Sequence, residues 1–448
     1  MPIALPSMNE LITGELAVNG NWVVANLDTQ IPWPNNLTKV TFCKRTLFLL
    51  PPTSTAMPDG GPLPSNETYP CVAVMLSPGE QFDNGILIIS HFLSSLAWVE
   101  QRGARVEYWS GGNLPRPMGG RPRHPTYTQQ FYCPYLPDSL EQRTRWALAF
   151  YREGLSLNHV AYQCLSFFKI MNIFLPAGPD QKKWMNDHLA DVSDQRAKER
   201  IALIEAQHQD VGEYLYSSGR CAIAHAGAEP TADPEDPADI RRLGEDLPLV
   251  QALAEVAIEQ EFGIKSASTV YREHLYELEG FHEVIRAPRV ARIKTLASIG
   301  PGDWPVLPRL SIRLAYHDAY EPLDKMNARL IKIDQGIACV ECTAEDGLTQ
   351  LRLNLNFALE RMQVDIIGEL ASRDDGSALA VQAAVKVGQF KLDYFKNGIL
   401  EVWNADTGRM LARCDAFLPH NVDMSGTIAS FEAAIQATQK EASKRTRS

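Results

Sequence analysis

The sequence has few cysteines and no long hydrophobic run. Eight cysteines in 448 residues are too few for a disulfide framework and indicate a reducing compartment. The most apolar stretches, residues 86–98 and 164–175, are shorter than the roughly 20 residues that a membrane-spanning helix needs. The first residues, MPIALPSMNELITGE, lack a basic segment followed by an apolar core, so we expect no secretory signal. These absences predict a cytoplasmic protein.

Motifs that mark common enzyme sites are also missing. The sequence has no Walker loop, no GxGxxG, no HExxH and no GxSxG. Cys339 and Cys342 form a CxxC pair, but it lies in a predicted strand, where odd spacing sends the two sulfurs to opposite faces. No second pair completes a zinc site. The sequence therefore predicts neither a metal nor a cofactor.

Basic residues are outnumbered by acidic ones, 43 against 54, which gives a formal net charge of −11. This balance argues against a protein that coats nucleic acid through its overall field, although a local basic patch stays possible. The hydrophobic fraction of 45% is that of a globular protein, and the length predicts several domains with separate cores.

Residues 1–140 are rich in proline and glycine, and their short apolar runs at 22–27, 40–50 and 71–76 predict strands. A helix capped by Asp83 and Asn84 is expected to reach about Val99. We therefore expect a β-rich or α+β domain over residues 1–140.

A loop from Tyr108 to His124 is expected to end this domain. Trp109 lies near three arginines of the loop, and these residues are candidate nucleic-acid contacts because aromatic rings stack on bases and guanidinium groups bind phosphate. The arginines are Arg116, Arg121 and Arg123. The alternative is a solvated loop that packs on the next domain.

Helical spacing dominates residues 141–290. Apolar side chains recur on one face from Trp146 to Met171, in one helix or two consecutive ones, and again from Ile201 to Leu215 in a single helix. Residues 229–246, with seven acids and three prolines, predict a solvated linker. Further helices at 249–262 and 269–281 complete an all-α helical bundle.

Alternating patterns follow a linker at residues 301–308. They predict strands at 312–316, 351–357 and 390–394, a hairpin at Asn397-Gly398 and a turn at residues 406–408. A helix from about Ile428 ends the chain. We expect an antiparallel β-sandwich or barrel with a terminal helix over residues 305–448, so the fold class is multidomain α+β.

An arginine and a histidine separated by four to six residues occur together three times, at Arg152/His159, Arg220/His225 and Arg413/His420. The context selects Arg220/His225, which follows an amphipathic helix and a Ser-Ser-Gly break. On a straight helix, residues five apart are rotated by about 140°, so one chain's pair would not converge on one phosphate. Either the helix breaks near Gly219, or two chains each contribute one motif to a shared site.

The segment RCAIAHA, together with the preceding aromatic helix TRWALAFYREGLSLNHVAYQCLSFFKIMNI, resembles the HEPN family (higher eukaryote and prokaryote nucleotide-binding). Members of that family carry an arginine-x4–6-histidine motif on a helical bundle. Over about residues 70–285, WSGGNLPRP, RCAIAHA, DPEDPADIRRLGEDLPL and YREHLYELEGF are similar to the MauJ-type proteins, which are named for methylamine-utilisation operons.

The HEPN resemblance implies a dimeric, metal-independent endoribonuclease in which Arg220 holds phosphoryl oxygens and His225 acts as acid or base. Cys221, where active members often carry a polar residue, and the acidic segment 229–246 favour the alternative of a non-catalytic binding or assembly protein of MauJ type. A structural role, with Arg220 in a salt bridge and His225 in the core, also stays open. The expected partners are RNA, a second copy of the chain, or a protein bound by the C-terminal β domain, and no membrane.

Overall fold

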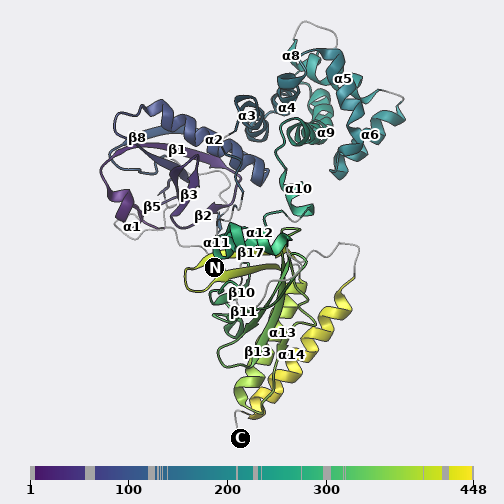
Figure 1. Cartoon of the computed structure of the whole chain (residues 1–448). Helices are drawn as coiled ribbons and strands as arrows, with labels where there is room; N and C mark the ends of the chain where they lie inside the picture. Colours follow the sequence, from purple (N-terminus) through teal and green to yellow (C-terminus); the bar gives the residue numbers. More distant parts are fainter. Residues whose placement is uncertain are drawn as a thin grey trace. The chain divides into compact units, whose positions relative to one another are not determined.

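The computed structural model describes residues 6–445, except 56–65, 120–126, 129–130, 132, 134, 139, 208–209, 226–230, 234, 274, 296–303, 316, 318, 397 and 416–422. The chain forms two compact units, Met1–Thr269 and Val270–Ser448 (Figure 1). The predicted fold class is confirmed, because the chain combines antiparallel N- and C-terminal sheets with a central helical region and a C-terminal helix. The division into three domains stays a prediction.

The N-terminal part of the first unit is built on a five-stranded antiparallel sheet, in the order β3-β4-β7-β1-β8. The strands are β1 (Asn21–Thr29), β3 (Thr38–Phe42), β4 (Arg45–Leu50), β7 (Cys71–Leu76) and β8 (Ala104–Gly112). They confirm the predicted strands, with the run 40–50 divided by a turn. The helix α2 (Phe82–Glu100) is confirmed, but it begins at Phe82, before the predicted cap, and Gln81 holds the cap position.

Small elements surround this sheet. They are α1 (Met8–Leu11), η1 (Gly14–Ala17), β2 (Trp33–Pro34) paired with β9 (Tyr127–Thr128), and β5 (Ser54–Thr55) paired with β6 (Asn66–Glu67).

The predicted loop at Tyr108–Gly112 is wrong, because these residues form the end of strand β8. They pair with β1 in register, Trp109 opposite Ala25 and Ser110 opposite Val24. The two glycines indicated a loop, but Gly111 is needed in the strand, since a Cβ there would lie 2.6 Å from the carbonyl oxygen of Trp22.

The rest of the first unit is helical (Figure 1). Its elements are α3 (Gln142–Ser156), α4 (Val160–Phe174), α5 (Gly178–Asp187), η2 (Leu189–Asp191), α6 (Gln195–Ala206), α7 (Val211–Tyr214), η3 (Leu215–Cys221), α8 (Ala222–Ala224) and α9 (Pro237–Glu261). The helix α10 (Ala267–Arg272) includes the last residues of the first unit and the first residues of the second. The two consecutive aromatic helices are confirmed as α3 and α4.

Two predictions for this region are wrong. The single helix through Ile201 and Leu215 is divided, because α6 ends at Ala206 and Asp210 caps a new helix by accepting from the backbone N–H of Glu213. The predicted linker 229–246 contains the first ten residues of α9. Pro237 occupies the first turn, where a missing N–H costs nothing, and Asp236 caps the helix.

Among the described residues, α2 is long and apolar enough to cross a membrane. The helices α4 and α5 would meet the same criteria together, but they are bent by 102° relative to each other. The apolar window of α2 is 50% buried within the protein, and a core helix meets the same criteria. The apolar composition of α2 follows from its contacts with the sheet and with α3.

The second unit contains two antiparallel sheets that share one hydrophobic core. One sheet has β11 (Asn327–Asp334), β12 (Ile337–Thr343), β13 (Thr349–Asn356), β14 (Arg361–Gln363) and β15 (Leu370–Ser372), and the other has β10 (Leu310–Leu314), β16 (Ile399–Asn404) and β17 (Arg409–Asp415). The helical elements are α11 (Glu279–Ile285), α12 (Ala287–Thr295), η5 (Glu321–Leu323), α13 (Ala378–Phe395) and α14 (Ser425–Arg445). The helices α13 and α14 pack side by side (Figure 1).

The predicted strand at 390–394 is wrong, because these residues belong to α13. Val387, Phe390 and Tyr394 recur at helical spacing and pack against the core, in a segment rich in alanine, and Ser377 caps the helix. The hairpin at Asn397-Gly398 is therefore also wrong. Asn397 lies outside the described residues, and Gly398 follows a helix, donating its N–H to the Tyr394 carbonyl oxygen at 3.0 Å.

Gly280 of α11 is required by the close approach of strand β17. A Cβ at this position would lie 2.4 Å from the Cα of Leu411 and from the Met410 carbonyl oxygen, and backbone atoms cannot rotate away. We expect Gly280→Ala to lower the free energy of unfolding of the second unit by about 1–3 kcal/mol in urea titrations. Gly426→Ala, in α14 with nothing within 4 Å, is the control and should not destabilise the unit. Equal midpoints for the two variants would contradict this packing.

The ion pairs of Glu341 should make the stability of the second unit depend on pH in the acid range. This buried residue of β12 lies opposite Arg329 and Arg352 on the neighbouring strands and binds both. The hydrogen bonds from Arg329, the larger cause, and from Arg352 lower the pKa of Glu341 below its ordinary 4.5. Its stabilisation is therefore present above pH 4.5 and lost as the pH falls through the lower folded-state pKa. In urea titrations from pH 7 to 3, Glu341→Gln should lose less stability than wild type, and parallel curves would contradict this expectation.

Candidate functional site

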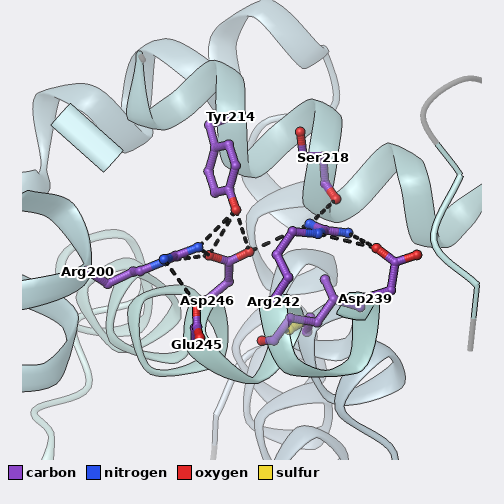
Figure 2. Close-up of polar contacts among 9 residues, drawn as sticks. Arg200, Tyr214, Ser218, Asp239, Arg242, Glu245 and Asp246 are labelled. Atoms are coloured by element: carbon purple, nitrogen blue, oxygen red, sulfur yellow. Dashed lines mark hydrogen bonds and ion pairs between the residues drawn. The ribbon is translucent and has the colours of Figure 1, made fainter. Parts of the chain in front are cut away.

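A buried ion-pair network ties the helices of the first unit together beside the arginine–histidine segment (Figure 2). Asp246 of α9, 2% exposed, accepts from Arg200 of α6 at 2.8 Å and from the hydroxyl of Tyr214 of α7 at 3.1 Å. Arg200 also donates to the Tyr214 oxygen at 3.0 Å. The consecutive helices α6 and α7 therefore meet α9 at one carboxylate.

Burial governs the electrostatics of this network. It raises the pKa of the Asp246 carboxyl, while the guanidinium of Arg200 opposes that effect. Burial also raises the pKa of the Tyr214 hydroxyl, which therefore keeps its proton and donates to Asp246. Removing either charge would leave the other with weaker contacts only, which are the exposed Glu245 at 3.3 Å for Arg200 and Arg242 at 3.8 Å for Asp246.

Arg242 extends the network to the arginine–histidine segment (Figure 2). Its guanidinium lies 3.8 Å from Asp246, binds Asp239 at 3.0 Å, and donates to the carbonyl oxygen of Ser218 at 2.8 Å. Ser218 belongs to η3, which is a π-helical turn over Leu215–Cys221. Arg242 therefore fastens the middle of this turn to α9.

The π-helical turn decides how Arg220 and His225 are presented. The helix does not break at Gly219, as one of the two predicted arrangements required; it widens over seven residues and then closes in α8. Such wide turns are uncommon and occur frequently at functional sites. His225 ends α8 with non-helical backbone angles, φ −127° and ψ 85°, so the two residues do not lie on one straight helix.

Both side chains of the motif reach solvent. Arg220 is half-buried and donates to the hydroxyl of Tyr216 at 3.2 Å, with its guanidinium 5.0 Å from the centre of the Tyr216 ring. It forms no ion pair within the part of the chain that the structure describes. His225 is exposed rather than buried in the core. Among the described contacts, no hydrogen bond links the side chains of His225 and Arg220.

Tyr216 joins a second cation to this surface. The amine of Lys182, on α5, lies 5.1 Å from the centre of the same ring and binds Glu213 at 2.6 Å. We call Lys182, Tyr216, Arg220 and His225 the motif surface. It offers two cations, a phenol and an imidazole.

The structure separates the N-terminal candidates. Trp109 packs against the core between the sheet and α2, whereas exposed Arg116 lines a cavity of about 420 Å³ with Val24 and Ser110, which belong to the other sheet face. Trp109 and Arg116 are therefore not brought together. Arg121 and Arg123 lie outside the described residues.

No group of three or more His, Cys, Asp or Glu side chains among the described residues is placed to hold a metal ion. Cys339 and Cys342 lie in strand β12, with Cys342 buried and Cys339 partly exposed, as odd spacing in a strand predicts. Burial raises the pKa of the Cys342 thiol to about 12, so this group is a packed thiol rather than a reactive one.

A comparison with known protein families matches the helical region from α3 to α9, which includes the motif surface. Residues 147–259 match the family model of the methylamine utilization protein MauJ. The match begins in α3, ends in α9 and includes the ion-pair network and Arg220/His225, a shorter range than the predicted 70–285. No curated protein and no solved structure matches the chain. The MauJ match does not test the HEPN resemblance, which stays a prediction.

Sequence reasoning missed the network within the MauJ-matching region. Arg200, Tyr214 and Asp246 have no recognisable spacing, because three different helices supply them. One sequence signal could have indicated part of the network. Proline is common in the first turn of a helix, so Pro237 could have marked a helix start, and Arg242 and Asp246, four residues apart, would then lie on one face of that helix.

Proposed function

We propose that this chain is a non-catalytic binding or assembly protein of methylamine utilisation, which uses its helical region for docking and for pairing with a second copy. The observation that carries the proposal is the MauJ match, because it covers the helices that form the motif surface. A cytoplasmic location and a protein contact through the second unit belong to the same proposal.

The chemistry of the motif surface supports docking. Arginine and tyrosine are among the side chains that are enriched at the energetic centres of protein interfaces, and the Arg220 guanidinium lies over the Tyr216 ring. The segment that leads into α9 and the first turns of α9 expose four acids, Asp233, Glu235, Asp236 and Glu245. These carboxylates would repel a polyanion, and they suit a protein partner with a basic rim.

Deletion of the gene tests this function. A deletion strain should lose growth on methylamine as the sole nitrogen source while growing normally on ammonium, and the wild-type gene should restore growth. Normal growth of the deletion strain on methylamine would remove the proposal. Light scattering of the purified full chain tests whether it pairs with a second copy, and the expected mass is near twice 49.9 kDa.

A second candidate function is the metal-independent endoribonuclease. The accessibility of Arg220 and His225 favours it, because an imidazole that moves a proton and a guanidinium that binds phosphoryl oxygens must both reach the substrate. Incubation of the pure protein with mixed RNA in EDTA separates the candidates. Cleavage that His225→Ala abolishes would establish the nuclease, whereas intact RNA would exclude it.

A further inference from the structure

The helix α3 carries aromatic side chains on a face that its own unit leaves open. Of the eight tryptophans, all in the described part of the chain, Trp146 alone is exposed, at 50%. Phe150, one turn further along α3, is partly buried. The helix packs into the unit through its opposite face, which carries the buried Leu148 and Tyr151. A half-exposed tryptophan next to a second ring is typical of the centre of a protein interface.

Opposite charges border these rings, one at each end. Arg143 lies three residues before Trp146, and Glu153 lies three residues after Phe150. The four side chains therefore follow the 3-4-3 spacing of a coiled-coil seam, and we call them the α3 stripe. Arg143 is exposed, and the side chain of Glu153 is 52% exposed. The two charges are ten residues apart, about 15 Å along the helix, and so cannot pair within one chain.

The local partners of both charges are weak. Arg143 donates to the carbonyl oxygen of Ile173, near the end of α4, and binds no carboxylate among the described residues. Glu153 contacts the guanidinium of the adjacent Arg152 at 3.4 Å. An exposed ion pair of this kind contributes little to stability. Both ends of the α3 stripe can therefore take a partner from outside the chain.

The α3 stripe is complementary to a second copy of itself in the antiparallel orientation. A two-fold axis at the level of Leu148 exchanges residues that lie equally far on either side of it. Arg143 of one copy then faces Glu153 of the other, since both are five residues from Leu148. Trp146 faces Phe150 in the same way, since both are two residues from Leu148. Each contact forms twice, so the charges match at both ends and the rings meet in the middle.

We propose that this chain pairs with a second copy through the α3 stripe, with the two α3 helices antiparallel. This inference rests on the pairing in the proposed function and names its surface. The helix α4 packs beside α3 and widens the face (Figure 1). Its Lys169 lies 5.4 Å from the centre of the Phe150 ring, and its Tyr162 is 54% exposed. This width is needed, because a stable interface buries about 800 Å² on each partner.

Analytical ultracentrifugation of the full chain measures the dissociation constant of the dimer. Trp146→Ser should raise it at least about a hundredfold, because truncating one aromatic at an interface centre costs about thirtyfold and the dimer loses two. Leu203→Ser is the matched control, since Leu203 is 55% exposed on α6, outside the α3 stripe. The control should change the constant less than about threefold, as expected for a residue outside the interface. Circular dichroism should show that both variants are folded.

Charge reversal tests the antiparallel register. Arg143→Glu places acids at both ends of the α3 stripe, and Glu153→Arg places bases at both ends. Each variant alone should therefore dimerise at least about tenfold more weakly than the wild type, because like charges face each other twice. A mixture of the two variants brings opposite charges together at both ends, and its heterodimer should be within about threefold of wild-type affinity. A role of either charge within its own chain would not give this recovery.

The outcomes separate this surface from the wider proposal. Wild-type dimers that survive Trp146→Ser, or a mixture of the two charge variants that recovers no affinity, would overturn the α3 stripe as the interface and leave pairing to another face. A wild-type chain that stays monomeric would remove the pairing itself. Growth of the deletion strain on methylamine tests the docking function separately from both results.

Discussion

Asp246→Ala is expected to lower the free energy of unfolding of the first unit by about 3–5 kcal/mol, the cost of breaking a buried ion pair. The substitution leaves Arg200, whose side chain is 14% exposed, without the carboxylate that it binds at 2.8 Å. The Tyr214 hydroxyl loses its acceptor at the same time. Urea titration of the full chain, monitored by tryptophan fluorescence, measures the loss.

Three further variants show whether the ion pair is the cause. Asp187→Ala removes an exposed carboxylate paired with Lys183 and should cost no more than about 0.5 kcal/mol. Arg200→Met added to Asp246→Ala should recover part of the loss, because it removes a largely buried guanidinium that then pairs only with the exposed Glu245. Arg200→Met alone completes the comparison: if the double variant is less stable by the sum of the losses measured for Asp246→Ala and for Arg200→Met, the pair is not coupled and this explanation is wrong.

In a deletion strain, the wild-type gene is expected to restore growth on methylamine. The gene carrying Arg220→Ala is expected not to restore it. Truncating an arginine at the centre of an interface costs about 2 kcal/mol, which corresponds to about a thirtyfold loss of affinity. A partner present near its dissociation constant would then occupy about 3% of the sites instead of half. Growth rate on methylamine is the measurement.

Arg196→Ala is the control for this variant, because Arg196 is an exposed arginine of α6 outside the motif surface. It should restore growth fully. Both variants must accumulate to the wild-type level, which immunoblotting checks. Full rescue by Arg220→Ala would show that the motif surface does not serve this function.

The sequence predicted regular elements where local patterns decide them. The strands around Trp22 and Cys71 and the helices α3 and α4 follow directly from alternation and helical spacing. The errors occurred where a tertiary contact decides. Gly111 indicated a loop until its pairing partner was known, and three alternating residues near Phe390 fitted a strand and a helix equally well.

The candidate site was predicted only in part. Arg220 and His225 were identified from their spacing and context, and both reach the surface. The π-helical turn was not foreseen, and neither was the hydrogen bond from Arg242 of α9 to the Ser218 carbonyl oxygen within it. A contact between residues 24 positions apart leaves no periodic signal in the sequence.

The π-helical turn that carries Arg220 is in contact with the ion-pair network. A π-helical turn is rare in proteins, and this one has a contact from outside the segment. Arg242 provides that contact and is itself held by Asp239 and Asp246. The ion-pair network therefore contacts the backbone of the segment from which Arg220 extends.

A photo-crosslink from the motif surface is the most direct test of docking. Ala224 is exposed between Arg220 and His225, and replacing it by p-benzoylphenylalanine places a reactive group there, with exposed Ala202 of α6 as the matched position. In cells grown on methylamine, we predict that position 224 crosslinks to a methylamine-utilisation protein or to a second copy of the chain. Crosslinks to RNA, or no more product than from position 202, would contradict the account.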